Sequence, residues 1–432
     1  MRHALALVAL LALPPAISAG GGGPAPRGTA GADLPITGLA VPGMASFDRI
    51  MTGLLAKWPV PGAAVAVVQD GRLVFARGYG WADREQRQPV EPDSLFRIAS
   101  LSKSLTAAAI LKLEEEGRLK LDDRAFQILR DLKPRPGAKI NPQLAQITLR
   151  QLLQHTGGWD RDQSFDPMFR SREIAQTMGV PSPADATTIV RYMLDQPLQS
   201  APGTHYAYSN FGYCVLGRVI EKVTGERYED FVKTQILRPA GITCLRLGHT
   251  LENERAPREV RYYSFPGAGL GPSVFPGGPA RLPWPYGAWS IEAMDSHGGW
   301  IASAVDLARF IDGLEGRGGV ARILRPASLQ QMLAPPAPPI PAAPDTWYGM
   351  GWQVRPANGD ANWWHAGSLD GTTTLMVRAA NGLTWVVLFN SRPKSDKFGG
   401  EVDSALWRAV DGVKQWPTHD LFAKFGGCPA GR

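Results

Sequence analysis

The sequence lacks the local signatures of several common enzyme and binding classes. Its seven histidines form no His-x-His or His-Glu-x-x-His pattern, so no metal site is indicated. No Gly-x-Ser-x-Gly turn is present, which argues against the α/β-hydrolase fold. The net charge of +7 is spread along the chain without a basic run or a nucleic-acid-binding motif. We therefore expect no metal, no other cofactor and no nucleic-acid partner.

Cysteine is scarce: the chain has only three, Cys214, Cys244 and Cys428. Cys214 and Cys244 both fall in the middle of the chain, where they could approach within bridging distance. An exported protein can keep such a disulfide. Buried free thiols are the alternative.

Long hydrophobic runs are also rare, and the clearest one is N-terminal. Residues 1–19 combine a basic start, an apolar run from Ala4 to Leu13 and small residues around Ala19. This pattern is typical of a signal peptide and is too short to span a membrane comfortably, although an uncleaved anchor is the alternative. No cysteine follows the run to suggest a lipid anchor. We expect an exported protein, periplasmic or secreted, with no transmembrane segment after signal removal.

The remaining chain divides by composition into three parts. Residues 20–45 are rich in Gly, Pro and Ala and predict a flexible leader. Residues 46–412 form one expected catalytic domain, and residues 413–432 a C-terminal tail. Residues 256–290 are rich in proline and aromatic side chains. They either wall a substrate cleft or cover a small core of their own.

The most informative chemical pattern is Ser100 followed three residues later by Lys103, at the start of an apolar helix. One helical turn separates the two residues, so their side chains share a face. Burial disfavours the charged form of a lysine, and a neutral amine can take the proton of a serine hydroxyl. The pattern recurs from Ser391 to Lys394, where Pro393 argues against a helix. A serine N-cap with a solvated lysine is the alternative at the first site.

A second candidate group is Tyr208 and Asn210, which lie between a Pro-Gly turn and another apolar helix. Tyr208 supplies a phenol that can relay a proton if neighbouring cations lower its pKa. Asn210 supplies an amide that can hold Lys103 on one side and a substrate carbonyl on the other. A core tyrosine beside an asparagine N-cap is the alternative.

A serine nucleophile also needs a strand edge that provides a second oxyanion N–H group. Three His-x-Gly triplets begin at His155, His297 and His365. The first ends a helical pattern, and the second precedes a helix expected to begin near Ala304. His365 instead leads into a hairpin with an Asn-Gly turn at 381–382, a strong hairpin signal. We therefore place His365 at the start of a core strand.

These three motifs, in this order, resemble those of the penicillin-recognising serine hydrolases, specifically the class C β-lactamase-like branch. That branch contains β-lactamases, D-alanyl-D-alanine carboxypeptidases, D-aminopeptidases and esterases. The resemblance runs roughly from Phe47 to Val410 and includes the phrases LLQHTGGW and HGGWIASAVDLARF. It implies an α/β (α+β), β-lactamase/transpeptidase-like fold: an antiparallel sheet flanked by helices, plus a helical lobe. In such a fold the N- and C-terminal hairpins share one sheet, and the site lies between the lobes.

The resemblance also implies roles for individual residues. Ser100 attacks a carbonyl, and Lys103 and Tyr208 share its proton. The backbone N–H groups of Ser100 and Ser368 form the oxyanion hole. The implied substrate-binding residues are Asn210, His365, Gly367 and Ser368.

The predicted function is an exported serine hydrolase that cleaves an amide or ester through an acyl-enzyme, of D-peptidase or esterase type. Its partner is a small-molecule or peptide substrate. Class C β-lactamases carry Lys-Thr-Gly as the third motif, whereas this chain has His365 and Ala366 in the first two positions. A neutral imidazole and a methyl group bind a substrate carboxylate less strongly than the ammonium and hydroxyl groups of Lys and Thr. A β-lactamase is therefore an alternative, as is a catalytically idle module that binds cell-wall peptides.

Overall fold

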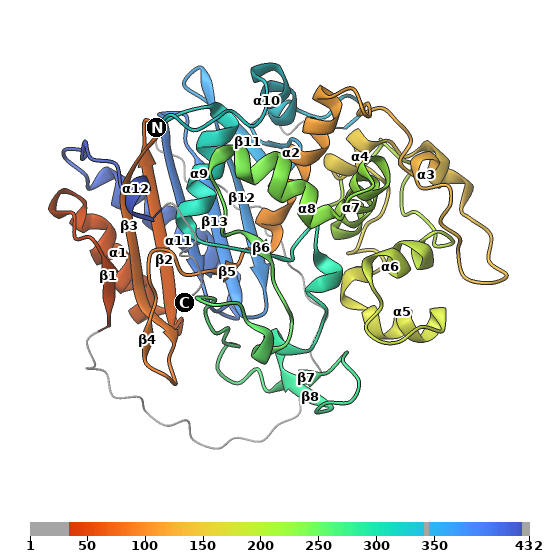
Figure 1. Ribbon diagram of the computed structural model, residues 1–432, viewed down its shortest axis with the longest axis horizontal. Helices are drawn as coiled ribbons and strands as arrows, with labels where there is room; N and C mark the ends of the chain where they lie inside the picture. Colours follow the sequence, from red (N-terminus) through yellow and green to blue (C-terminus); the bar gives the residue numbers. More distant parts are fainter. Residues whose placement is uncertain (1–33, 341–344, 426–432) are drawn as a thin grey trace.

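We describe the chain from a computed structural model, which defines residues 34–340 and 345–425. Its centre is a nine-stranded antiparallel sheet (Figure 1). The strand order is β1-β3-β2-β14-β13-β12-β11-β10, and β4 pairs with β3. The strands of this sheet are β1 (Ile36–Gly38), β2 (Gly62–Gln69), β3 (Arg72–Asp83), β4 (Gln88–Pro89), β10 (Trp347–Tyr348), β11 (Gln353–Ala357), β12 (Asp360–Leu369), β13 (Thr372–Arg378) and β14 (Leu383–Phe389).

Both faces of the sheet are covered by helices, because its central strands are apolar on both sides. Successive side chains of a strand point to opposite faces. On β2, Val65 therefore packs into the core layer that contains α1 (Ala45–Lys57) and α11 (Lys397–Asp411). The next residue, Ala66, joins the layer that contains α9 (Ala304–Glu315). The helix expected near Ala304 is thus confirmed.

The predicted hairpins at the two ends of the chain do lie in one sheet. β2 and β3 form the first, and Asp70 and Gly71 in its turn both have positive φ, as a tight two-residue turn requires. β13 and β14 form the second, with Gly382 at φ +86° in the Asn-Gly turn. β14 then pairs with β2, so Val386 lies opposite Ala66. This pairing brings the third motif close to the N-terminal half of the chain.

The middle of the chain forms a helical lobe beside the sheet, to the right in Figure 1. Helix α2 (Ser102–Glu115) lies where the lobe meets the sheet, and it is buried almost all round, as its apolar sequence predicts. The lobe helices are α3 (Ala125–Ile128), α4 (Leu149–Leu153), α5 (Ser171–Met178), α6 (Ala186–Met193), α7 (Asn210–Thr224) and α8 (Tyr228–Val232). Within the described residues, no helix is both long and apolar enough to cross a bilayer.

The ordered domain extends beyond the expected limits of 46–412 at both ends. Residues 36–38, placed in the predicted leader, form β1 and pair with β3. In the predicted tail, the N–H group of Leu421 donates to the carbonyl of Leu73, and Phe422 is buried. Sequence composition missed both contacts because they join residues far apart in the chain. Residues 1–19 and Cys428 lie outside the described part.

Of the two alternatives for Cys214, the structure shows the free thiol, and the possible disulfide with Cys244 is not formed. Cys214 is a free thiol, buried in the core on α7, and burial raises its pKa. Its sulfur lies 3.8 Å from the carbonyl oxygen of Ala186. Cys244 packs instead into a separate small cluster with Leu95 and Ile301. The two cysteines therefore belong to different packing units, although both are in the middle of the sequence.

Candidate active site

Ser100 lies in a short 3-10 helix, η2 (Ala99–Leu101), between β5 (Phe96–Arg97) and α2. The residue before it, Ala99, has φ +47°, so the backbone turns sharply at this point. Two threonines of β13 hold the approach to this turn. Thr372 Oγ1 donates to the carbonyl of Arg97 at 2.8 Å, and Thr374 Oγ1 donates to that of Ile98 at 3.1 Å. The sheet thereby fixes the position of Ser100.

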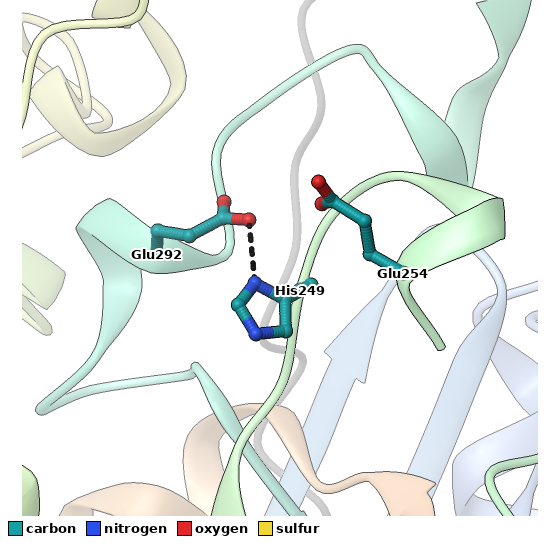
Figure 2. A group of neighbouring side chains, drawn as sticks. All are labelled: His249, Glu254 and Glu292. Carbon is teal, nitrogen blue, oxygen red and sulfur yellow. Dashed lines mark ion pairs between the residues drawn. The ribbon is translucent and has the colours of Figure 1, made fainter. Parts of the chain in front are cut away.

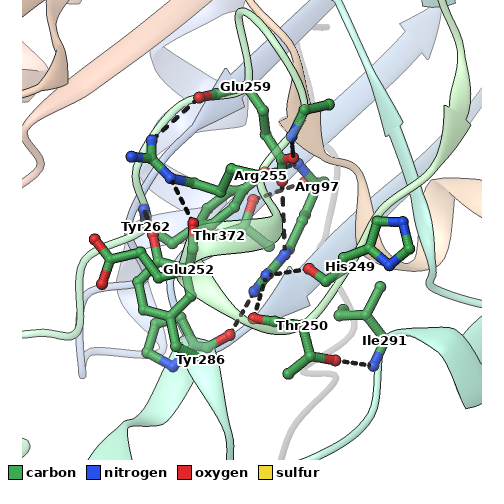
Figure 3. Close-up of polar contacts among 12 residues, drawn as sticks. Arg97, His249, Thr250, Glu252, Arg255, Glu259, Tyr262, Tyr286, Ile291 and Thr372 are labelled. Carbon is green, nitrogen blue, oxygen red and sulfur yellow. Dashed lines mark hydrogen bonds and ion pairs between the residues drawn. The ribbon is translucent and has the colours of Figure 1, made fainter.

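Arg97 anchors the same segment on its other side (Figure 3). Its guanidinium is fully buried, donates to the backbone carbonyls of His249, Thr250 and Pro285, and lies 4.3 Å from the ring centroid of Tyr262. The Tyr262 hydroxyl accepts the Arg97 backbone N–H at 2.7 Å.

The loop at 256–290 therefore contributes to the core. Tyr262, Tyr286 and Trp289 are all buried in the main hydrophobic cluster. The interpretation of this loop as a packed cover thus holds for these three aromatic side chains.

Lys103 is completely buried one turn after Ser100, and its amine faces three oxygen atoms. Nζ lies 3.1 Å from Ser100 Oγ, 2.8 Å from Asn210 Oδ1 and 3.0 Å from the carbonyl oxygen of His297. Burial lowers the pKa of Lys103 well below its usual value, and the nearby Arg161 lowers it further. A neutral amine has two N–H donors and one lone pair. The Asn210 and His297 oxygens can accept both donors, which leaves the lone pair for the Ser100 hydroxyl.

Asn210 is itself held in one orientation. Its Nδ2 donates to Asp166 Oδ2 at 2.6 Å, so its Oδ1 must point toward Lys103. Ser209 caps helix α7 by accepting the N–H of Gly212, which fixes the start of the helix that carries Asn210. The alternative of an N-cap at Asn210 is therefore wrong: Ser209 is the cap, and the asparagine amide binds Lys103 and Asp166.

Tyr208 packs beside Lys103, with Nζ 4.8 Å from its ring centroid. Its hydroxyl is buried close to Ser100 but forms no hydrogen bond of standard geometry with any described residue. Burial raises the pKa of Tyr208 above 10, and the neighbouring Ser100 and Arg161 offset only part of this rise. The condition that cations lower the pKa of this phenol is therefore not met. Tyr208 is therefore a phenol that can donate a proton, and the lowered pKa of Lys103 makes that amine the better base of the two.

The third motif lies on β12, next to the Ser100 turn, so His365 is in the middle of a core strand and not at its start as predicted. β11 pairs with β12 only as far as Trp364, and beyond this point the strand runs along η2. Gly367 permits the close approach, because a Cβ atom there would lie 2.5 Å from the carbonyl oxygen of Ile98 and 2.3 Å from Thr374 Oγ1. The structure thus brings Gly367 and Ser368 to the edge where the second oxyanion donor was expected.

Both ring nitrogens of His365 are occupied by the protein. Nδ1 lies 2.7 Å from the carbonyl oxygen of Ala366, so this nitrogen carries the proton. Nε2, 2.9 Å from the Tyr348 hydroxyl, is then the acceptor. Burial lowers the pKa of His365 to about 3, with a further contribution from Lys103. His365 is therefore neutral at pH 7 and orients Tyr348, and it offers no charge to a substrate.

Sequence reasoning missed several residues that complete the site. His155 has φ +58° just after helix α4, as expected for a helix end, yet its ring packs 4.3 Å from that of Tyr208. The carbonyl of His297 binds Lys103, while Arg161 and Asp166 come from the loop after α4. The phrase LLQHTGGW, noted for its resemblance, was the available signal for this loop. No local sequence pattern identified Asp166 as a site residue.

A different group of polar side chains lies elsewhere on the surface (Figure 2). Ligand atoms of His249, Glu254 and Glu292 lie within 4.8 Å of one another, and all three residues are exposed. Local spacing could not reveal this group, since its members come from separate segments. Glu292 already accepts hydrogen bonds from Thr250 and Ser290, and such exposed acidic groups are common without an ion.

Comparison with known proteins identifies the family. A family model described as Beta-lactamase matches residues 47–404, which is most of the chain. The protein therefore belongs to the beta-lactamase family, as its three motifs predicted. The putative penicillin-binding protein PbpX of Bacillus subtilis (strain 168) is 27% identical over 349 residues, or 80% of this chain and 74% of that protein. Protein flp of Staphylococcus aureus (strain N315) is 29% identical over 222 residues, but this match spans only 41% of the staphylococcal protein and 51% of this chain.

Solved structures confirm the fold. The octameric penicillin-binding protein homologue from Pyrococcus abyssi is similar with a TM-score of 0.66 and 24% identity, covering 86% of this chain and 79% of that chain. D-amino acid amidase from Ochrobactrum anthropi SV3, in its complex with D-phenylalanine, gives a TM-score of 0.66 and 23% identity, covering 86% and 98%. At these identities the likeness establishes the predicted β-lactamase/transpeptidase-like architecture.

Proposed function

We propose that this chain is a serine hydrolase that cleaves a small ester or amide, of D-peptidase or esterase type, through an acyl-enzyme on Ser100. The observation that carries the proposal is the environment of Lys103, whose two donors are taken by Asn210 and His297 while Ser100 lies 3.1 Å away. A module that only binds peptides has no use for a buried lysine of lowered pKa beside a serine hydroxyl.

The first half of the proposed reaction follows from these contacts. The neutral Lys103 amine takes the Ser100 proton while Oγ bonds to the substrate carbonyl carbon. The backbone N–H groups of Ser100 and Ser368 stabilise the negative charge that forms on the carbonyl oxygen. Tyr208 then donates its phenolic proton to the departing alcohol or amine, and the Lys103 ammonium returns a proton to Tyr208.

In the second half, water replaces the leaving group. Lys103, neutral again, takes a proton from the water molecule while the water oxygen attacks the acyl-enzyme carbonyl. The ester bond to Ser100 breaks, Ser100 Oγ regains a proton, and a carboxylic acid leaves. No other reactant is needed.

The third motif supports ester or amide cleavage over β-lactam hydrolysis. His365 is neutral and both its nitrogens are engaged, and Ala366 supplies only a methyl group. We expect kcat/KM for small nitrophenyl esters to exceed that for a chromogenic cephalosporin by at least about tenfold, or about 1.4 kcal/mol. The test compares nitrophenyl esters, D-phenylalanine amide, a D-alanyl-D-alanine peptide and the cephalosporin on one purified sample.

Two further results complete this test. The double variant His365→Lys, Ala366→Thr should narrow the gap between the ester and the cephalosporin. Equal turnover of the cephalosporin and the esters by the wild-type protein would replace this proposal with a β-lactamase. Turnover of none of the substrates would leave the idle binding module as the better interpretation.

We also propose export of the protein, on the basis of residues 1–19. The basic start and the apolar run up to Leu13 support recognition as a signal peptide. Mass spectrometry of the secreted or periplasmic protein should find an N-terminus between Ala19 and about Gly23. Recovery of only the full-length chain from the cytoplasm would contradict export.

A further inference from the structure

Arg161 is a cation of the candidate site that belongs to none of the three motifs and has no contact with the substrate in the proposed reaction. It lies on the loop between α4 and the short helix η4 (Pro167–Phe169), on the helical-lobe side of Ser100. Its guanidinium carbon is 5.2 Å from the ring centroid of Tyr208, and its side chain is only 17% exposed. Its positive charge lowers the pKa of Lys103, as expected for a cation close to that amine.

The donors of Arg161 are largely uncommitted. Its nearest carboxylates are Asp166, at 3.8 Å, and the exposed Asp162, at 3.9 Å, and it forms no hydrogen bond with any described residue. Asp166 Oδ2, the nearer oxygen, is already bonded to Asn210 at 2.6 Å. By contrast, the buried Arg378 binds Glu315 and Asp360 at 2.7 and 2.6 Å. A mostly buried guanidinium without close partners retains donors for a ligand.

We propose that Arg161 forms an anion subsite that binds a carboxylate of the substrate. It lies on the loop between α4 and η4, whereas the third motif lies on β12. A guanidinium binds a carboxylate with two parallel hydrogen bonds, which favours a carboxylate over an anion that can accept only one. The subsite supplies from the helical lobe the positive charge that His365 does not supply from β12. It narrows the substrate class to esters or amides that carry a free carboxylate away from the scissile bond.

This inference rests on the proposed hydrolase function, and matched substrates test it separately. Mono-4-nitrophenyl adipate and 4-nitrophenyl hexanoate share a six-carbon acyl chain and differ by the terminal carboxylate. The wild-type protein should prefer the adipate ester, and Arg161→Gln should lower kcat/KM for it at least tenfold, mainly through KM. The hexanoate ester should change less than threefold. Arg161→Lys should retain part of the adipate preference, since lysine keeps the positive charge but cannot form the two parallel hydrogen bonds.

A control variant and a second readout make the result decisive. Arg170→Gln removes an exposed arginine of the same segment, stacked on Phe165, and should leave both esters unchanged. Any shift of the Lys103 pKa in Arg161→Gln would alter both esters together, so the ratio of the two reports the subsite. Free adipate should raise the Tm of the wild-type protein but not of Arg161→Gln.

The outcomes separate the two proposals. Turnover of neither ester by the wild-type protein, with adipate stabilisation that depends on Arg161, would reject the hydrolase and keep the anion subsite. Equal loss on both esters in Arg161→Gln, without an adipate effect on Tm, would reject the subsite and keep the hydrolase.

Discussion

Ser100→Ala is expected to reduce kcat/KM for the best ester by at least about 10⁴-fold, to the level that binding and oxyanion donors alone can support. The variant removes the oxygen that bonds to the substrate carbonyl, while Lys103 keeps its bonds to Asn210 and His297. Its fold should be unaffected, since β13 holds the turn before Ser100 through the backbone carbonyls of Arg97 and Ile98. Steady-state kinetics with a matched Tm measurement checks this expectation.

A fluorophosphonate probe gives the same prediction a covalent readout. The wild-type protein should gain one adduct on the peptide that contains Ser100, and Ser100→Ala should gain none. Ser102 and Ser391 are the natural controls, because both are buried and donate to backbone carbonyls, of Ala99 and Tyr263 respectively. An adduct on either of them would overturn the assignment of the nucleophile.

The sequence allowed prediction of those parts of the fold that depend on local patterns. Alternating apolar residues and an Asn-Gly turn indicated the hairpins, and the apolar sequence of α2 indicated a buried helix. The shared sheet came from the resemblance, not from periodicity. β1 and the pairing of Leu421 with Leu73 were missed, because short strands and single backbone bonds leave no period in the sequence.

Site residues that belong to a sequence motif could be predicted, whereas groups that only the tertiary structure brings to the site could not. Ser100, Lys103 and Asn210 meet as expected, at 3.1 and 2.8 Å. The second acceptor for Lys103 is the backbone carbonyl of His297, which no side-chain motif can specify. Asp166, which orients Asn210, lies 44 residues away in sequence. The pKa direction of Tyr208 also escaped prediction, since it depends on how deeply the phenol is buried.

Lys103→Gln is expected to lower kcat/KM by at least about 10³-fold, or about 4 kcal/mol of transition-state stabilisation. The glutamine amide can still donate to Asn210 Oδ1 or the His297 carbonyl, but it cannot accept the Ser100 proton. Lys103→Arg should be equally inactive, because a guanidinium stays protonated and offers no lone pair. In the wild-type protein, activity should fall as the pH drops through the lowered pKa of Lys103. That acid limb should be absent from the residual activity of Lys103→Gln.

Replacing Lys103 should lower activity without lowering the stability of the fold. The pKa of Lys103 is lowered by folding, so at a pH between the folded pKa and the ordinary value the unfolded chain binds a proton that the folded chain releases. Stability from this group therefore rises with pH between the folded pKa and the ordinary value near 10.5. Lys103→Gln does not lose stability in this way, and its Tm in this pH range should equal or exceed that of the wild-type protein. The site thus keeps a residue that weakens the fold because the reaction requires a neutral amine.

The activity of Lys103→Arg decides the assignment of the base. Substantial activity in this variant would show that a group other than Lys103 takes the Ser100 proton.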